Sequence, residues 1–270
     1  MSAELRFFKV EKDGPVVIWK FKNPPRNLLT IETHMELIGL VEAFEADPEL
    51  RAAILTSGVP GVFIQHFDVS SILDWAEEPK QITERLAKAD DEPQEPVGIA
   101  AHGPKPIICA INGLTGGGGC ELALTCDIRI MSREAVIGQP EVRAGFPPGG
   151  GGTQRLARFV GVPKALELCL SGRMIEADEA ERIGLVNRAC DPDELMPIAI
   201  ELAKEIAANP PLGVAIVKQC IYEGSDMSLK DGLALEKKLF FEAIQSEAAM
   251  EIMRNYVAIG QNPENAPSED

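Results

Sequence analysis

The stretch Asn112–Asp127 reads NGLTGGGGCELALTCD, so four consecutive glycines separate a strand-like run from an apolar helical pattern. Glycines let the backbone approach a ligand closely, and the start of a helix offers N–H groups that have no partner within the helix. Such groups can bind an anion, including one that forms only in a transition state. The run lacks the lysine of a nucleotide-phosphate loop and the spacing of a dinucleotide fingerprint. Taken alone, it is explained equally well by a tight turn or by close packing.

Two glutamates accompany the glycine-rich segments. Glu121 lies shortly after Gly118 and is expected to project from the first turn of the helix. Glu141 lies in a second segment, Ile137–Leu156, which reads IGQPEVRAGFPPGGGGTQRL. In isolation, a helix-dipole contact explains Glu121 and surface exposure explains Glu141. Together, two carboxyl groups tied to backbone-exposing segments predict a general acid–base pair whose pKa values are raised by burial.

A third segment, Val62–Ser70, reads VFIQHFDVS. Its strand-like run ends at His66, and Asp68 is predicted to cap the helix that follows. An imidazole titrates near neutrality, which makes His66 a candidate for catalysis. A single histidine with no visible partner is nevertheless more often structural, so this segment alone decides nothing.

The acidic balance of the chain limits its partners. The sequence holds 42 Asp and Glu against 26 Lys and Arg, a formal net charge of −16. This charge argues against nucleic-acid binding, which needs a basic face, and against docking on an anionic membrane. No uncharged apolar run reaches the roughly 18 residues of a membrane span, and Met1–Gly14 lacks the apolar centre of a signal peptide. The six cysteines form no C-x-x-C pair, so we expect a cytoplasmic protein with neither metal site nor disulfide framework.

Strand-like and helical patterns alternate through the first part of the chain, which predicts an α/β architecture. Helical patterns dominate from Asp193 onward. We therefore predict an α/β body over residues 1–192, a helical region over 193–260 and a disordered polar tail over 261–270. The strand-like runs are Val16–Phe21, Ala52–Thr56, Pro106–Ile111 and Ile128–Met131. The late helical stretches are Leu195–Ala207, Leu212–Tyr222 and Ser228–Tyr256.

Two further local features are predicted. The clearest early helix follows Thr30, which is expected to cap it. An acidic, proline-bearing stretch, Glu77–Pro96, is predicted to be a helix–loop excursion on the surface, an explanation favoured over a substrate lid. The expected apolar face of the early helix comprises Ile31, Met35, Ile38 and Val41.

The three segments together resemble the crotonase superfamily, the enoyl-CoA hydratase/isomerase family. The resemblance covers most of the chain, from Asn23 to Phe240, and is strongest in Asn112–Ala123 and Gly138–Leu156. Both motifs in this order and spacing are highly specific. The resemblance implies a spiral of β-β-α units with a helical C-terminal region that packs in trimers, which often pair into hexamers.

The resemblance also implies the chemistry. Members bind an acyl-CoA thioester and polarise its carbonyl with two backbone N–H groups, which correspond here to Phe67 and Gly118. Family hydratases carry both glutamates, so the resemblance implies hydration of a 2-enoyl thioester, with Glu121 as the base toward water and Glu141 as the acid toward C2. No metal and no cofactor are expected, apart from coenzyme A as part of the substrate. The candidate substrate-binding residues are Arg26, Gln65, His66, Asp68 and Gly117.

The sequence departs from the family pattern in two places. The first oxyanion segment usually reads Phe-x-Ala-Gly-x-Asp, whereas His66 here replaces the glycine and Phe67 a small residue. Ser70 also stands near the place where many members carry a lysine or arginine, and no Lys or Arg follows Arg254. Lys22 and Arg26 remain as candidates for holding the phosphates of coenzyme A.

These departures keep other activities open. Within the same fold, the alternatives are a double-bond isomerase, a thioester hydrolase, a decarboxylase or a C–C hydrolase. A trimeric binding or scaffold protein without catalysis is a further alternative, because a fold alone does not define a function. The retention of both glutamates and both glycine-rich segments argues against a non-enzymatic role.

Overall fold

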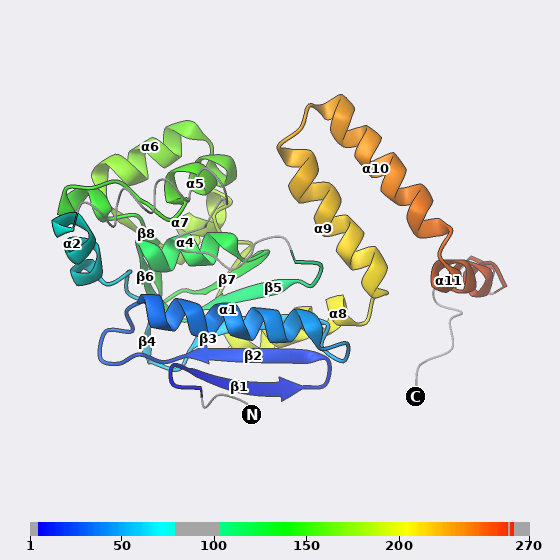
Figure 1. Cartoon of the computed structure of the whole chain (residues 1–270), viewed down its shortest axis with the longest axis horizontal. Helices are drawn as coiled ribbons and strands as arrows, with labels where there is room; N and C mark the ends of the chain where they lie inside the picture. Colours follow the sequence, from blue (N-terminus) through cyan, green and yellow to red (C-terminus); the bar gives the residue numbers. More distant parts are fainter. Residues whose placement is uncertain (1–4, 79–102, 259, 262–270) are drawn as a thin grey trace. The chain divides into compact units, whose positions relative to one another are not determined.

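The computed structural model describes residues 5–78, 103–258 and 260–261 (Figure 1). The chain divides into two compact units between Ala208 and Asn209. This division lies later than the predicted boundary after residue 192, because the helix α8 (Leu195–Ala207) packs on the sheet of the first unit. The predicted excursion beyond Glu78 and the predicted tail beyond Gln261 lie outside the described residues.

The larger sheet has six strands in the order β1-β2-β3-β5-β7-β10. Its first two strands form an antiparallel hairpin, and all other pairs are parallel. Four of its strands coincide with the predicted strand-like runs to within a residue. The strands are β1 (Phe8–Asp13), β2 (Val16–Phe21), β3 (Ala52–Ser57), β5 (Ile107–Ile111), β7 (Ile128–Ser132) and β10 (Arg188–Cys190).

Both faces of this sheet are buried. Alternate side chains of β2 point to opposite faces, so Trp19 belongs to one core and Ile18 to the other. The second core lies under α8, whose Ala199 and Ala203 are fully buried. Small residues one turn apart let the helix backbone approach the strands closely.

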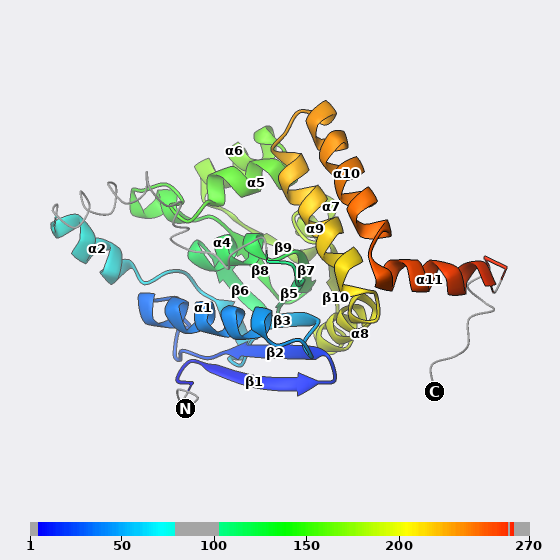
Figure 2. The same cartoon turned by 45° about the vertical axis from the view of Figure 1, so that its right-hand side comes forward.

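The smaller sheet has the order β4-β6-β8-β9, with β4 (Gly61–Ile64), β6 (Gly113–Gly116), β8 (Val136–Gly138) and β9 (Met174–Glu176). Its first three strands are mutually parallel, and β9 is antiparallel to β8. Figure 2 brings β6, β8 and β9 into view beside α4. The sequence-based reading recognised none of β6, β8 and β9 as strands, because they are only three or four residues long.

A β-β-α pattern repeats along the first unit. In each repeat, one strand enters the larger sheet, the next enters the smaller sheet, and a helix follows. The repeats are β3-β4-α2, β5-β6-α4 and β7-β8-η1, which is the spiral that the resemblance implies. Since β4, β6 and β8 are parallel, the loops at their carboxyl ends meet at one edge of the small sheet. The helices of this part are α2 (Val69–Glu77), α4 (Gly118–Thr125), the 3-10 helix η1 (Glu141–Ala144) and α5 (Gly152–Val160).

The helix α1 (Ile31–Ala46) begins where it was predicted, because the hydroxyl of Thr30 accepts the N–H of Thr33. Its predicted apolar face is wrong apart from Val41: Met35 is 59% exposed. Contact with the sheet selects the inward face instead, as the ring of Phe44 packs edge-on against a buried tryptophan of β2. The buried side chains of α1 are Thr33, Leu37, Val41 and Phe44.

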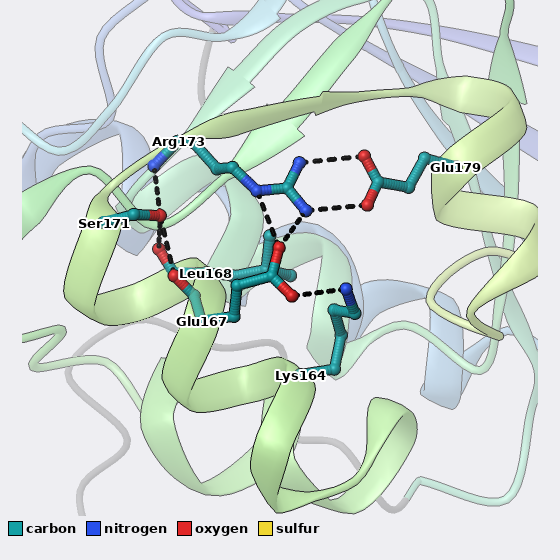
Figure 3. A network of polar contacts seen from close by, with 6 residues as sticks. All are labelled: Lys164, Glu167, Leu168, Ser171, Arg173 and Glu179. Carbon is teal, nitrogen blue, oxygen red and sulfur yellow. Dashed lines mark hydrogen bonds and ion pairs between the residues drawn. The ribbon is translucent and has the colours of Figure 1, made fainter.

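Ion pairs join α6 (Val162–Ser171) to α7 (Ala177–Arg182) through Arg173, which lies immediately before β9 (Figure 3). The guanidinium donates to the carboxylates of Glu167 and Glu179. Lys164 and Arg173 together lower the pKa of Glu167, and Arg173 lowers that of Glu179. Because these groups are mostly exposed, solvent and salt screen the pairs, and each contributes little to stability. The network secures the end of the strand that pairs with β8.

The second unit consists of α9 (Pro211–Ser225), α10 (Leu229–Ile244) and α11 (Glu247–Ala258). The single late helix predicted over Ser228–Tyr256 is wrong, because Ser246 interrupts it. The Ser246 hydroxyl accepts the N–H of Ala249 and so caps the start of α11. Among the described residues, no helix has both the length and the apolarity needed to cross a membrane.

Candidate active site

Three loops meet at the carboxyl ends of β4, β6 and β8. The N–H of Gly116 donates to the carbonyl of Gln65 at 3.1 Å, and the N–H of Gly117 donates to that of Gly138 at 3.0 Å. These bonds join the first loop to the second and the second to the third. In parallel sheets, ligands commonly bind beyond the carboxyl ends of the strands, and this edge therefore is the natural place for a site.

A cavity of about 360 Å³ opens at this edge. Its wall is mainly apolar, and its polar exceptions are His66, Glu121 and Glu141. The apolar part comes from one side of α2, from the turn after η1 and from the glycine-rich turns. These residues are Val69, Ile72, Trp75, Ala144, Phe146 and Pro147. Such a wall fits an acyl group, with a few polar groups left to act on it.

The carboxyl group of Glu121 accepts hydrogen bonds from two backbone donors. Its side chain is only 3% exposed, and burial raises its pKa. The N–H groups of Gly150 and Gly152 both donate to Oε1, at 2.6 and 2.9 Å, and oppose that rise. The positive charge of Arg155 opposes it as well. Both N–H groups donate to Oε1, so among the described residues Oε2 is the oxygen left for a bound reactant.

Glu141 experiences a different environment. It is 9% exposed, and burial raises its pKa to about 7, with a further contribution from the negative charge of Glu121. The buried amide of Gln139 lies against its carboxyl group. In the amide orientation that satisfies both groups, the nitrogen donates to Oε1 at 2.8 Å and to Oε2 at 3.2 Å. Burial thus raises the pKa of both glutamates, while the hydrogen-bond donors around the two carboxyl groups differ.

Phe67 and Gly118 also line the cavity, and their backbone amides are candidate hydrogen-bond donors. Gly118 is the first residue of α4, so its N–H has no acceptor within the helix. Phe67 forms a parallel bridge with Leu29, in which the carbonyl of His66 accepts the N–H of Leu29 and the N–H of Asp68 donates to the carbonyl of Leu29. The N–H of Phe67 itself therefore points away from Leu29. A Cβ added to Gly118 would lie 3.0 Å from the nitrogen of Phe67, so only glycine lets the two amides approach. Within the described residues, no backbone bond uses either N–H.

Six of the nine residues predicted from sequence line this cavity. They are His66, Phe67, Gly117, Gly118, Glu121 and Glu141. Gln65, Asp68 and Arg26 do not. The backbone of Gln65 bonds to neighbouring loops, and the carboxylate of Asp68 caps α2 through Ser70, as predicted. Arg26 is exposed on a loop, and the carbonyl of the next residue, Asn27, accepts the N–H of Gln65.

Sequence reasoning missed several residues of the site. Trp75 and Phe146 line the cavity, and Gln139 contacts Glu141. The helical spacing of Val69, Ile72 and Trp75 after the cap at Asp68 was a usable signal for α2. Nothing in the sequence marked Gln139, because its role depends on a tertiary contact. Among the described residues, no group of three His, Cys, Asp or Glu is placed to hold a metal ion.

The chain matches known proteins over nearly its full length. The family model for enoyl-CoA hydratase/isomerase matches residues 11–263. A short-chain-enoyl-CoA hydratase of Clostridium acetobutylicum is 36% identical over 94% of this chain and 95% of that protein. A probable enoyl-CoA hydratase of Rhizobium meliloti is 35% identical over 92% and 94%.

Solved structures agree with these sequence relatives. The crystal structure of an enoyl-CoA hydratase from Bacillus anthracis superposes with a TM-score of 0.83 at 31% identity, covering 94% of this chain and 96% of that one. The expected α/β spiral is therefore confirmed. The chain belongs to the enoyl-CoA hydratase/isomerase family, within the crotonase superfamily.

Proposed function

We propose that this protein adds water reversibly across the 2,3 double bond of an acyl-CoA thioester. The observation that carries the proposal is that two buried glutamates, whose pKa values are both raised by burial, line one apolar cavity together with Phe67 and Gly118. The names of the relatives support the same reaction. Coenzyme A enters as part of the substrate, and no separate cofactor takes part.

The electrostatics assign the two roles. Glu141, with a pKa of about 7, is about half protonated at neutral pH and mostly protonated below it, and is suited to act as the acid. Glu121 accepts two backbone N–H groups and faces the charge of Arg155, which favour its ionised form. Glu121 is therefore the base, and its free Oε2 accepts a proton from the attacking water.

The reaction balances with these residues alone. Glu121 takes one proton from water as the hydroxyl oxygen bonds to C3, and the π electrons of C2=C3 move to the thioester oxygen. The amides of Phe67 and Gly118 stabilise the resulting enolate, and a single donor of this kind typically contributes about 3–4 kcal/mol. Glu141 then delivers its proton to C2, and the thioester carbonyl re-forms. The substrate thereby gains one water molecule, and the enzyme returns to its starting state when Glu121 gives its proton to solvent and Glu141 takes one up.

Arg26 is the proposed contact for the phosphates of coenzyme A. It is exposed, and the same loop packs on the first site loop because the N–H of Leu29 donates to the carbonyl of His66. Lys22 is a second exposed cation nearby in the sequence. Calorimetry should show CoA binding that weakens in Arg26→Ala. An unchanged affinity would exclude Arg26 as the anchor.

The reaction is tested by following the enone-thioester absorbance with a panel of short, branched and aryl 2-enoyl-CoA substrates. We expect the wild type to consume absorbance and form the 3-hydroxyacyl thioester, while Glu141→Gln and Glu121→Gln lose nearly all turnover. Glu134→Gln, at an exposed turn, is the matched control and should retain activity. Release of free thiol would instead indicate hydrolysis, and a shifted double bond without hydroxylation would indicate isomerisation.

We also propose that the chain assembles as a homotrimer or a dimer of trimers. Large apolar side chains on α10 remain exposed in the single chain, with Leu229 80% exposed, and Leu233 and Phe240 exposed as well. An apolar surface of this kind is commonly an interface. Sedimentation should give three or six times the monomer mass of 29.2 kDa. A monomer at micromolar concentration would contradict this assembly.

A further inference from the structure

The side chain of His66 bonds to the backbone of the residue that follows it. Its Nδ1 lies 2.6 Å from the carbonyl oxygen of Phe67. A carbonyl oxygen only accepts, so Nδ1 carries the hydrogen and donates. The contact closes a small ring across the peptide that joins His66 to Phe67. That peptide contains the Phe67 N–H, which is the amide proposed above to bind the enolate oxygen.

Among the described residues, neither the N–H nor the carbonyl of Phe67 forms a hydrogen bond with another backbone group, unlike its neighbours in the loop. The carbonyls of Gln65 and His66 accept N–H groups of Gly116 and Leu29, and the N–H of Asp68 donates to Leu29. The carbonyl of Phe67 is instead satisfied by the imidazole of His66. Buried backbone groups are nearly always paired, so this side-chain bond has a structural consequence.

The side chain of Phe67 is held as well. Its ring packs against Trp75 with centroids 5.6 Å apart, and the residue is buried. The loop also packs closely on the start of α4, since a Cβ added to Gly118 would stand 2.9 Å from the Cβ of Phe67. The ring is therefore fixed by α2, and the imidazole fixes the carbonyl. Between these two constraints lies the N–H of Phe67, a residue that lines the cavity.

We propose that His66 is a positioning residue that aims the Phe67 N–H at the substrate carbonyl through its Nδ1–H bond. This inference rests on the proposed role of Phe67 in the reaction. His66 would replace, by a side-chain bond, the backbone geometry that other members obtain with a glycine at this place. The imidazole acts on the peptide and not on the reacting atoms, although it lies on the cavity wall.

Replacing His66 by asparagine or by glutamine distinguishes this positioning role from a direct contact with the substrate. Asparagine places its side-chain nitrogen near the position of Nδ1, whereas glutamine reaches the position of Nε2. If His66 acts by positioning, His66→Asn should keep most of the turnover, and His66→Ala and His66→Gln should lose about tenfold or more in kcat. A complete loss of one oxyanion donor costs about 10²–10³ in kcat, which sets the upper limit. KM should change little, because the acyl and CoA contacts remain.

The carbonyl itself gives a second readout. In a Glu141→Gln background, which keeps the thioester unreacted, infrared difference spectra with a ¹³C-labelled carbonyl report its polarisation. We expect binding to lower the carbonyl frequency, His66→Ala to reduce that shift, His66→Asn to restore it and His66→Gln to leave it reduced. Circular dichroism on each variant checks that it is folded, and the comparison of Asn with Gln stands even where Ala fails to fold.

The outcomes are distinguishable. If binding causes no frequency shift with His66 intact, the proposed use of the Phe67 and Gly118 amides fails, whatever His66 does. If the shift is present but unchanged in all three His66 variants, the positioning role is overturned while the proposed function stands. If Gln restores turnover and Asn does not, Nε2 contacts the substrate directly, which also overturns the positioning role.

Discussion

A methyl group added to the α-carbon of Gly117 would stand 3.0 Å from Oε1 of Glu141. Gly117 also has a φ of 50°, in the left-handed region that side chains disfavour. It therefore sets the position of the Glu141 carboxyl group by leaving it space. The same residue begins the turn into α4, so one glycine serves both the turn and the acid.

Replacing Gly117 by alanine should lower kcat at least tenfold, because the new methyl displaces the carboxyl group that protonates C2. The positive φ adds a stability cost of about 1–2 kcal/mol. Gly14 is the matched control: its φ is 57° and no atom lies within 4 Å of an added Cβ. Gly14→Ala should show a similar loss in denaturant unfolding with unchanged kcat. Equal losses of kcat in both variants would exclude the contact with Glu141 as the cause.

The pH dependence of turnover should report Glu141. Hydration requires Glu141 protonated and Glu121 ionised. With a pKa of about 7, Glu141 in the free enzyme loses its proton as pH rises, so kcat/KM should fall above pH 7, approaching tenfold per pH unit. Dehydration also needs one proton shared between Glu121 and Glu141. Its kcat/KM should therefore fall above pH 7 in the same way. Initial rates in both directions across pH 5–9 test this, and a profile flat to pH 9 would contradict it.

Glu141→Gln should stabilise the protein at alkaline pH while abolishing turnover. The pKa of Glu141 rises from 4.5 to about 7 on folding, so its folding contribution is fully present below pH 4.5 and is lost as pH rises to about 7. Above pH 7, the wild type holds a buried charge that glutamine lacks, a difference of about 2–3 kcal/mol.

Urea unfolding at pH 5 and pH 8 measures this difference. The stabilisation by Glu141→Gln should grow between the two values, whereas the exposed control Glu134→Gln should show no such growth. A stability difference that is the same at both pH values would mean that Glu141 does not titrate differently on folding.

Arg155→Gln should weaken the base. Arg155 lowers the pKa of Glu121 by its charge, and its Nη1 donates to the carbonyl of Gly150 at 3.1 Å, so it also steadies the turn that carries one N–H donor. Without it, the pKa of Glu121 should rise further. Hydration should then slow several-fold at low pH and recover as pH increases. Arg158→Gln, one turn later on the exposed side of α5, should leave the profile unchanged.

Local patterns predicted much of the fold. The strand β2 and the helix α8 have the bounds expected from sequence, and Thr30 and Asp68 are caps, because alternation and capping depend on neighbours along the chain. Short strands such as β8 escaped detection, since three residues carry no period. The buried face of α1 was not predicted either, because the sheet beneath the helix decides which side is buried.

The sequence by itself determined the family and the identity of the two glutamates, because the glycine-rich motifs are contiguous and specific. Only the tertiary structure decided their unequal chemistry. The N–H groups that donate to Glu121 come from Gly150 and Gly152, about thirty residues further along the chain. Glu141 instead lies in a buried wall that raises its pKa to about 7. A carboxyl group's pKa depends on the solvent, charges and donors around it, and folding alone brings those together.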